Sequence, residues 1–276
     1  MDEIGLYADL GMKGTVVQRF RWVNPGTFIM GSPKDEPERE SWGRETQHQV
    51  TLSKGFWLAD TAVTQKLWQA VMGKNPARFK GEYHPVENVN WMDIQQFLTE
   101  LNRLIPVISA RFPTEAEWEY ACRAGTTTPF SFGDKITSSQ VNYNGNYPYH
   151  KGVKGTFRQK TVAVKSLPCN LWGLYAMHGN LWEWCQDFWQ EDLLTEMVID
   201  PIGPKNGDFR LVRGGSWFIN GRGVRSAIRG RFSPEFGNDR IGFRLALDHL
   251  GNSVSPFQGS RIKGSPDELQ RQMIVK

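Results

Sequence analysis

Tryptophan and glycine place the strongest limits on what this chain can fold into. The 276 residues include 11 Trp, 28 Gly and 15 Pro. This balance favours short strands, turns and long packed loops over helical bundles, because Gly and Pro interrupt regular elements. The length allows a substantial core without disulfides. We therefore expect an α+β protein with short antiparallel strands, few short helices and much irregular loop.

The charge pattern argues against several classes of function. The formal net charge is only +4, and acids interrupt the basic residues, so no Lys/Arg run could follow a phosphate backbone. Residues 1–20 contain no apolar signal-peptide core, and no stretch is apolar enough to span a membrane. We expect a soluble chain that binds no nucleic acid. Its localisation is open, and surface display would require a missing segment or a partner.

The cysteines and histidines carry no metal-binding pattern. Cys122, Cys169 and Cys185 are the three cysteines, and they form no CxxC pair, which argues against a disulfide scaffold or a zinc knuckle. The five histidines show no HxxxH or HxxxHxE spacing. We interpret each histidine as a surface or hydrogen-bonding residue.

Local patterns predict three short helices and several strands. The helices are predicted at residues 65–72 between Thr64 and Gly73, from Asn90 or Trp91 to Pro106, and from Thr114, with Glu117 completing a capping box, to Gly125. The strands are predicted at 20–23 and 28–30 as a hairpin, at 48–52 and 56–59 as a pair, and at 210–213 and 241–246. Residues 126–168 have no period and are expected to form loops.

Seven blocks of sequence, in this order, resemble the formylglycine-generating-enzyme (sulfatase-modifying factor) family. They are residues 25–32, 85–91, 111–121, 170–175, 179–184, 213–217 and 242–244. The resemblance covers roughly residues 20–248 and implies a single domain with a variant of the C-type-lectin-like fold. Residues 1–19 would then be an N-terminal extension, and residues 249–276 a C-terminal tail.

The cysteine pair of the resembling oxidase is missing. In that family two cysteines, five residues apart, follow a Gly-Gly-Ser-aromatic motif, bind copper and supply thiolate chemistry. Registered on residues 214–217, their positions fall on Ile219 and Val224, which cannot bind a metal. We therefore expect no catalysis. The alternative is a cysteine-less tailoring oxidoreductase, since the family's siderophore-tailoring branch also lacks the pair.

The resemblance implies calcium as the candidate ion, with no other cofactor. The ligands that it implies are Asn142, Tyr143, Gly179, Leu181 and Glu183. Two substitutions weaken these sites. Ala176 provides no ligand oxygen for the site of Glu183, and the acid expected for the site of Asn142 falls on or near Lys154, whose cation repels calcium.

The segment 213–245 resembles the variable region of the variable proteins of diversity-generating retroelements, in which diversified residues are displayed on this fold. In those systems adenine-specific mutagenesis rewrites Asn-type codons at their first two bases, which cannot produce Lys, Gln, Glu, Met or Trp. None of the loose positions between residues 218 and 239 carries one of these types once Glu235 is assigned to the fixed frame. The candidate ligand-binding residues are Trp217, Phe218, Ile219, Asn220, Arg222, Gly223, Ile228, Gly230, Phe232, Ser233, Phe236, Gly237, Asn238, Asp239 and Arg240.

We interpret these residues as the binding surface of a non-catalytic, receptor-like variable protein whose ligand is a protein or a glycan. Phenylalanine anchors beside adaptable Ser, Asn and Gly are the composition of known paratopes. A competing interpretation is an ordinary surface loop in a decayed enzyme homologue. Arg225, Arg229 and Arg231 have a structural interpretation of their own, as ion-pair or carbonyl-binding residues.

Overall fold

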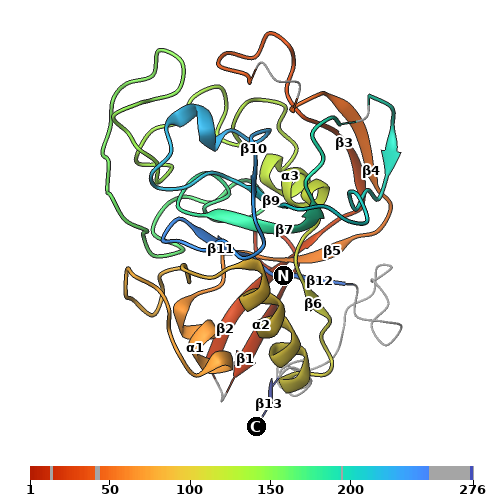
Figure 1. Cartoon of the computed structure of the whole chain (residues 1–276), viewed down its shortest axis with the longest axis vertical. Coiled ribbons are helices and arrows are strands. Elements are labelled where there is room, and N and C mark those ends of the chain that lie inside the picture. Colours follow the sequence, from red (N-terminus) through yellow and green to blue (C-terminus); the bar gives the residue numbers. More distant parts are fainter. Residues whose placement is uncertain (13–14, 41–43, 194, 249–273, 276) are drawn as a thin grey trace.

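A computed structural model describes residues 1–12, 15–40, 44–193, 195–248 and 274–275 (Figure 1). The helices are α1 (Gln65–Met72), α2 (Trp91–Leu104), α3 (Glu115–Arg123) and the 3-10 turn η1 (Gly221–Val224). The strands are β1 (Tyr7–Met12), β2 (Thr15–Val23), β3 (Gly26–Met30), β4 (His48–Leu52), β5 (Phe56–Ala59), β6 (Ala110–Arg111), β7 (Trp182–Phe188), β8 (Val198–Ile199), β9 (Arg210–Arg213), β10 (Arg229–Phe232), β11 (Ile241–Phe243), β12 (Ala246–Leu247) and β13 (Ile274–Val275).

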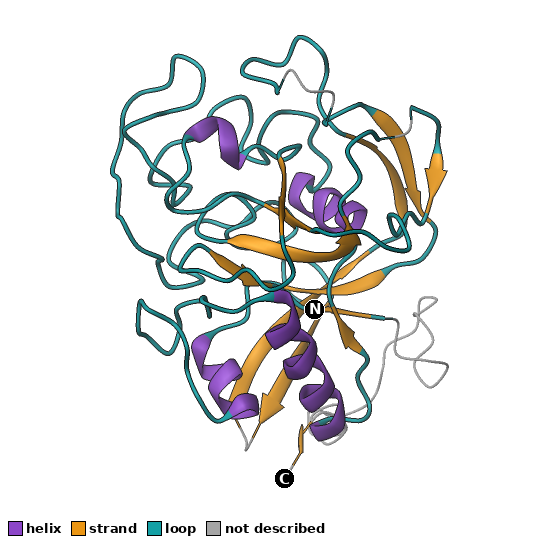
Figure 2. Cartoon of the chain, viewed as in Figure 1, coloured by secondary structure: helices purple, strands orange, loops and turns teal. Residues whose placement is uncertain are grey.

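The described strands form three mainly antiparallel sheets. One sheet has the order β13-β1-β2-β5-β12-β6, the second β10-β9-β7-β11, and the third β3-β4-β8. The half of the molecule away from α1 and α2 consists mostly of loop, and residues 126–168 contain no helix or extended strand (Figure 2). The architecture confirms the expected α+β class with short strands and few helices.

The predicted helix boundaries are confirmed because local capping chemistry sets them. The hydroxyl of Thr64 accepts a hydrogen bond from Leu67, and Gly73 ends α1 in the left-handed conformation. Both Asn90 of α2 and Thr114 of α3 form complete capping boxes. The helix α3 ends one residue earlier than predicted, at the left-handed Ala124.

The predicted pairing of the early strands is wrong. Strands β2 and β3 do not form a hairpin, since β2 pairs with β1 and β5 whereas β3 pairs with β4. The strands β4 and β5 also belong to different sheets, so the chain crosses between sheets at each short connection. The predicted strand at 241–246 is divided into β11 and β12, which also join different sheets.

The boundary predicted at residue 20 cuts through the six-stranded sheet. Strand β1 pairs with β2 from Tyr7 opposite Arg21 to Met12 opposite Thr15, and Leu10 is fully buried in the main core. Residues 7–12 and 15–19 are thus part of the domain rather than an extension, because Leu10 lies in its core and Met12 and Val17 pack against it. Of the predicted tail, 249–276, only residues 274–275 are described, and they pair with β1.

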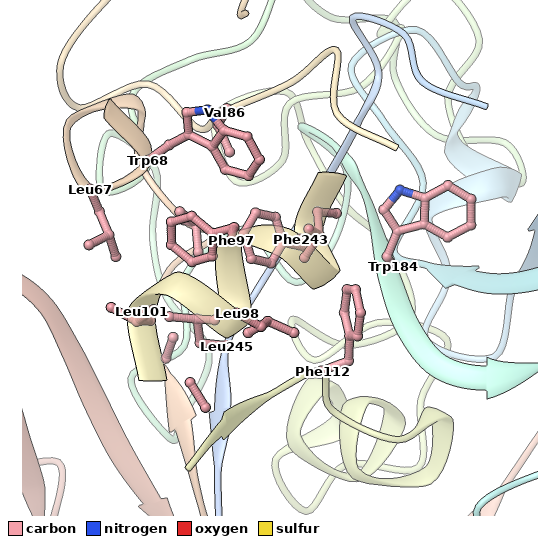
Figure 3. Close-up of a cluster of buried hydrophobic side chains, with 14 of the residues drawn as sticks. Leu67, Trp68, Val86, Phe97, Leu98, Leu101, Phe112, Trp184, Phe243 and Leu245 are labelled. Atoms are coloured by element: carbon pink, nitrogen blue, oxygen red, sulfur yellow. The ribbon is translucent and has the colours of Figure 1, made fainter. Parts of the chain in front are cut away.

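Aromatic rings from distant segments meet in the main core (Figure 3). Trp68 of α1 stacks on Phe97 of α2 with ring centroids 5.1 Å apart, and Phe243 of β11 contacts both rings edge-on. Along β7, Trp182 and Trp184 pack on this core. The carboxylate of Glu183, which lies between them, faces the opposite side of the strand, because side chains alternate along a strand.

A buried ion pair lies on that opposite side and ties β7 to the chain after β11. The guanidinium of Arg244 donates to both carboxylate oxygens of Glu183, each at 2.9 Å, and to the carbonyls of Ala59 and Tyr175. The indole of Trp118 donates to the same carboxylate at 2.7 Å. Because all these groups are buried, removal of one charge would leave the other without compensation.

Replacing Arg244 should therefore destabilise the domain strongly. We expect Arg244→Met to lower the free energy of unfolding by about 3–5 kcal/mol, since Glu183 would be left buried and unpaired. Urea unfolding followed by tryptophan fluorescence measures this loss. The double variant Arg244→Met/Glu183→Gln keeps an acceptor for Trp118 and should recover part of the lost free energy of unfolding.

The matched control is Arg103→Met, because Arg103 is an exposed arginine that pairs with Glu100 on α2. Its effect should be within about 1 kcal/mol. Equal losses for Arg244→Met and Arg103→Met would contradict a structural role for the buried pair.

Candidate ligand-binding site

Buried arginines hold the segment 213–245 to the rest of the domain. Arg213 pairs with Glu119 of α3 and donates to the carbonyls of Ala227 and Ser226. Burial opposes ionisation of Glu119, but Arg123 and Arg213 outweigh this effect and lower the pKa of its carboxyl. The acid therefore stays charged inside the protein.

Two further arginines anchor the middle of the segment. Arg225 pairs with Glu45 at 2.7 Å and with Glu36 at 2.5 Å, both from the loop after β3. Arg229 of β10 forms a two-pronged pair with Glu115 of α3, at 2.6 and 2.9 Å. We call Arg213, Arg225, Arg229 and Arg244 the frame arginines. The structural interpretation of Arg225 and Arg229 is confirmed, because both side chains are almost wholly buried.

The chain between Arg213 and Arg225 forms an aromatic patch at the surface. Phe218 is 42% exposed, and the guanidinium of Arg240 lies 3.7 Å from its ring centroid. Behind it, Trp217 is buried and contacts the rings of Phe157 and Phe79. Its indole donates to the carbonyl of Asp239, which connects the two ends of the candidate surface, residues 217–240.

A second patch follows β10. Phe236 is 40% exposed and stacks on Phe232 with ring centroids 4.9 Å apart. Phe232 in turn contacts Trp184 of the core edge-on. This makes Phe236 the accessible ring, whereas Phe232 is half-buried and supports it.

Several polar members of the predicted set also have local partners. The side chain of Asn220 accepts from the backbone of Gly223 and caps η1. Arg222 pairs with Glu40 at 3.3 Å, and Asp239 pairs with the exposed Arg78 at 2.5 Å. The exposed or half-exposed members are Phe218, Ile219, Asn220, Arg222, Gly223, Gly230, Phe232, Ser233, Phe236, Gly237, Asn238, Asp239 and Arg240. Glu235, which was assigned to the frame, is exposed as well.

Five of the predicted positions are constrained by packing. Trp217 and Ile228 are buried, with 6% and 4% of their surface exposed, so neither side chain can offer a ligand much area. A Cβ would lie 2.1 Å from Cγ2 of Ile219 at Gly223, 2.9 Å from Cγ2 of Val212 at Gly230, and 3.1 Å from the carbonyl carbon of Val89 at Gly237. The prediction that Trp217 and Ile228 contact a ligand is therefore corrected, and so is the prediction that the glycines are freely variable.

Sequence reasoning missed three residues of the surface. Phe79, Phe157 and Arg78 contribute rings and charge around Trp217 and Asp239, yet they come from loops far away in the sequence. No local periodicity marks them. Only the pairing of distant loops, which a single sequence does not display, brings them to the site.

The positions of the missing cysteines are occupied by packing residues. Val224 is fully buried in a cluster with Phe130 and Tyr149. Cys122 lies 3.7 Å from Nε2 of His178, but burial raises the pKa of its thiol to about 12. A thiol of that pKa stays protonated and is a poor nucleophile or metal ligand. The copper chemistry of the family does not fit these residues.

Of the residues implied as calcium ligands, Glu183 has another partner. Both oxygens of Glu183 bind Arg244, so this carboxylate does not fit a calcium site. The amide of Asn142 donates to the carbonyl of Lys160 and to Asn180, while its Oδ1 is buried without a partner. In the described part of the chain, no group of three or more acidic, His or Cys side chains could hold a metal.

An unusual carboxyl group lies beside the frame. Asp187 of β7 accepts a hydrogen bond from the backbone of Glu115, the partner of Arg229. Burial, followed by the charge of Glu115, raises the pKa of Asp187 to about 7. Its charge is therefore suppressed at and below neutral pH.

Comparison with known proteins gives the same assignment as the sequence blocks. A family model described as "Sulfatase-modifying factor enzyme 1-like domain" matches residues 10–249. The formylglycine-generating enzyme of Mus musculus is 32% identical over 211 residues, which cover 74% of this chain and 54% of that enzyme. That of Thermomonospora curvata is 32% identical over 255 residues, covering 86% and 75%. The chain thus spans about half the length of its mammalian relatives.

Two solved structures share the fold closely. Treponema denticola variable protein 1 has a TM-score of 0.77 and 26% identity, with 88% of this chain and 99% of that chain covered. PvdO from Pseudomonas aeruginosa has a TM-score of 0.70 and 26% identity, with 84% and 94% covered. The predicted resemblance is confirmed. Separately, none of the helices in the described ranges has the length and apolar character that crossing a bilayer requires.

The raised pKa of Asp187 predicts how the stability of the domain changes with pH. The pKa of Asp187 is higher in the folded chain than the ordinary aspartate pKa of 3.8, so the folded chain holds a proton that the unfolded chain has released between about pH 4 and pH 7. Its contribution to stability is thus lost as pH rises through that window. Relative to the wild type, Asp187→Asn should gain roughly 1–3 kcal/mol between about pH 5 and pH 8 in urea unfolding.

The control is Asp208→Asn, because Asp208 is exposed. Its free energy of unfolding should equal that of the wild type at both ends of this pH range. A difference between Asp187→Asn and the wild type that does not change with pH would contradict the raised pKa.

Proposed function

The chain belongs to the sulfatase-modifying factor enzyme 1-like domain family, and from this premise we propose that it is a non-catalytic ligand-binding protein. In this proposal it is a variable protein of a diversity-generating retroelement, and the candidate surface is the part that is diversified. The likeness to Treponema denticola variable protein 1 supports this assignment over a catalytic one.

One observation carries the proposal: the segment 213–245 separates into buried charges and exposed loose positions. The frame arginines are buried and paired with acids outside the segment. Between them Phe218, Ser233 and Phe236 face solvent. A ligand-binding surface of changing sequence needs this division, because the scaffold must keep its fold while the displayed residues change.

The chemistry of the candidate surface suits a protein or glycan ligand. Rings such as Phe218 and Phe236 supply contact area with little side-chain entropy to lose, and stack on sugar rings or apolar side chains. Arg240 lies over Phe218 and adds a positively charged donor. Asn238 and Ser233 supply adaptable hydrogen bonding beside them.

The gene's neighbourhood provides the decisive test. We expect a reverse-transcriptase gene nearby, together with a second copy of the DNA encoding residues 213–245. That copy should carry adenines where the candidate surface varies, and should match the codons of the frame arginines. A neighbourhood with neither feature would contradict the retroelement assignment.

A cysteine-less tailoring oxidoreductase is the second candidate, because several relatives carry the name of an enzyme. In that case the purified chain should retain copper or iron near one atom per chain, measured by inductively coupled plasma mass spectrometry. It should also turn over a peptide or chromophore substrate. The first proposal expects neither metal retention nor turnover.

The exposed rings should matter for binding and not for folding. We expect Phe218→Ser and Phe236→Ser each to change stability by no more than about 0.5 kcal/mol. Each should weaken binding to a glycan or protein ligand found by array screening of the wild-type chain by at least about fivefold. Thermal unfolding and surface plasmon resonance measure the two effects.

Phe232→Ser is the matched contrast, because Phe232 packs on Trp184 and should lose stability measurably. If Phe218→Ser destabilises the chain as much as Phe232→Ser does, the exposed ring is structural and the interpretation as a binding residue is wrong.

A further inference from the structure

A cavity of about 510 Å³ lies between α2, β6, the end of β7 and the start of β9. This volume falls within the range of roughly 300–1,000 Å³ that is usual for small-molecule sites. Its walls combine apolar surfaces, from Trp91, Phe112 and Phe188, with polar side chains such as Gln95 and Gln186. None of the residues of the candidate surface lines it. It is therefore a separate site on the domain.

One arginine is clamped between rings at this cavity. The guanidinium carbon of Arg210 lies 3.9 Å from the ring centroid of Trp91 and 3.4 Å from that of Phe188. Its Nη1 donates to the carbonyl of Gln186. Trp91 is itself fixed, since it stacks on Phe112 and its indole donates to the carbonyl of Cys185. The clamp holds the guanidinium in one plane, which suits two-point recognition of an anion.

The positive charge at the cavity is compensated by no direct ion pair of the described residues, and Asp187 acts on Arg210 only from beyond contact distance. Arg210 and Lys205, which both line the cavity, form no ion pair with any acid of the described residues. The Nε and Nη2 atoms of Arg210 likewise have no hydrogen-bond partner there. By contrast, the nearby Arg111 is paired with Glu117 and Asp248. A half-buried cation with unused donors is costly unless an anion or water satisfies it.

We propose that this cavity binds a small organic carboxylate whose apolar body packs against Trp91, Phe188 and the exposed Ile202. The carboxylate accepts two hydrogen bonds from Arg210, and Lys205 adds charge at the rim. A carboxylate fits better than a free inorganic anion, because the rings of the cavity offer contact area that only an apolar body can use. The proposal is independent of ligand binding at the candidate surface.

The test compares three probes on the full chain. These are 3-phenylpropionate, the matched alcohol 3-phenylpropan-1-ol, and inorganic phosphate. Binding is followed through the indole ¹H–¹⁵N signal of Trp91, which is assigned by its loss in Trp91→Phe. We expect 3-phenylpropionate to shift this signal with a dissociation constant of about 1 mM or below, and the other two probes to bind at least about fivefold more weakly.

Variants separate the role of Arg210 from general charge. Arg210→Gln should weaken the binding of 3-phenylpropionate at least about tenfold. The affinity of Arg210→Lys should lie between those of Arg210→Gln and the wild type, because lysine keeps the positive charge but cannot donate two parallel hydrogen bonds as the guanidinium does. Lys205→Gln, at an exposed position, should weaken binding less and leave thermal stability unchanged. The control Arg103→Gln removes an exposed arginine of α2 that does not line the cavity and should have no effect.

Several results would overturn the proposal. One is equal binding of the acid and the alcohol, and another is tighter binding of phosphate than of the acid. A third is unchanged affinity in both Arg210→Gln and Lys205→Gln, and a fourth is no response of Trp91 up to about 10 mM probe. Phe218→Ser should bind 3-phenylpropionate like the wild type, so failure of this site and failure of the surface proposal are distinguishable.

Discussion

Buried pairs between arginines and carboxylates hold the last part of the domain in place. Arg213, Arg225, Arg229 and Arg244 each pair with acids that come from other parts of the chain. Burying such charges is costly, and the cost is offset here by forked geometry and by additional bonds to backbone carbonyls. The arrangement specifies one path for the segment, since any other path would leave charges unpaired. The candidate surface depends on this path.

In the proposed function, this dependence lets a fold that is shared with enzymes serve recognition. The frame arginines lie beneath the surface, so exposed residues such as Phe218, Ser233 and Phe236 are not needed to hold the fold. Where the family's oxidase has cysteines, this chain has Ile219 and a buried Val224, which extends a small apolar cluster. The buried Cys122 is unreactive because burial raises the pKa of its thiol. Apolar side chains thus stand where the family's oxidase has its reactive cysteines.

The helices could be predicted from sequence because their caps are local, as Thr64, Asn90 and Thr114 demonstrate. The sheets could not, since a strand and its partner are far apart along the chain. For example, β12 pairs with both β5 and β6. The domain type was identified because seven blocks of sequence resemble a known family, and the spacing of residues alone did not predict it. Exposure within the candidate surface also escaped prediction, because the burial of Ile228 depends on neighbours that sequence spacing does not reveal.

Packing limits which positions of the candidate surface can vary, even where the codons allow it. Gly230 and Gly237 face neighbouring chain so closely that any side chain would require a shift. A diversification system that wrote larger residues there would lose folded molecules. Diversity that preserves the fold must therefore concentrate at sites such as Phe218, Ser233 and Phe236, whose side chains reach solvent. In the proposed function, the usable binding surface is therefore narrower than the segment 213–245, and it is bordered by Phe79, Phe157 and Arg78 from distant loops.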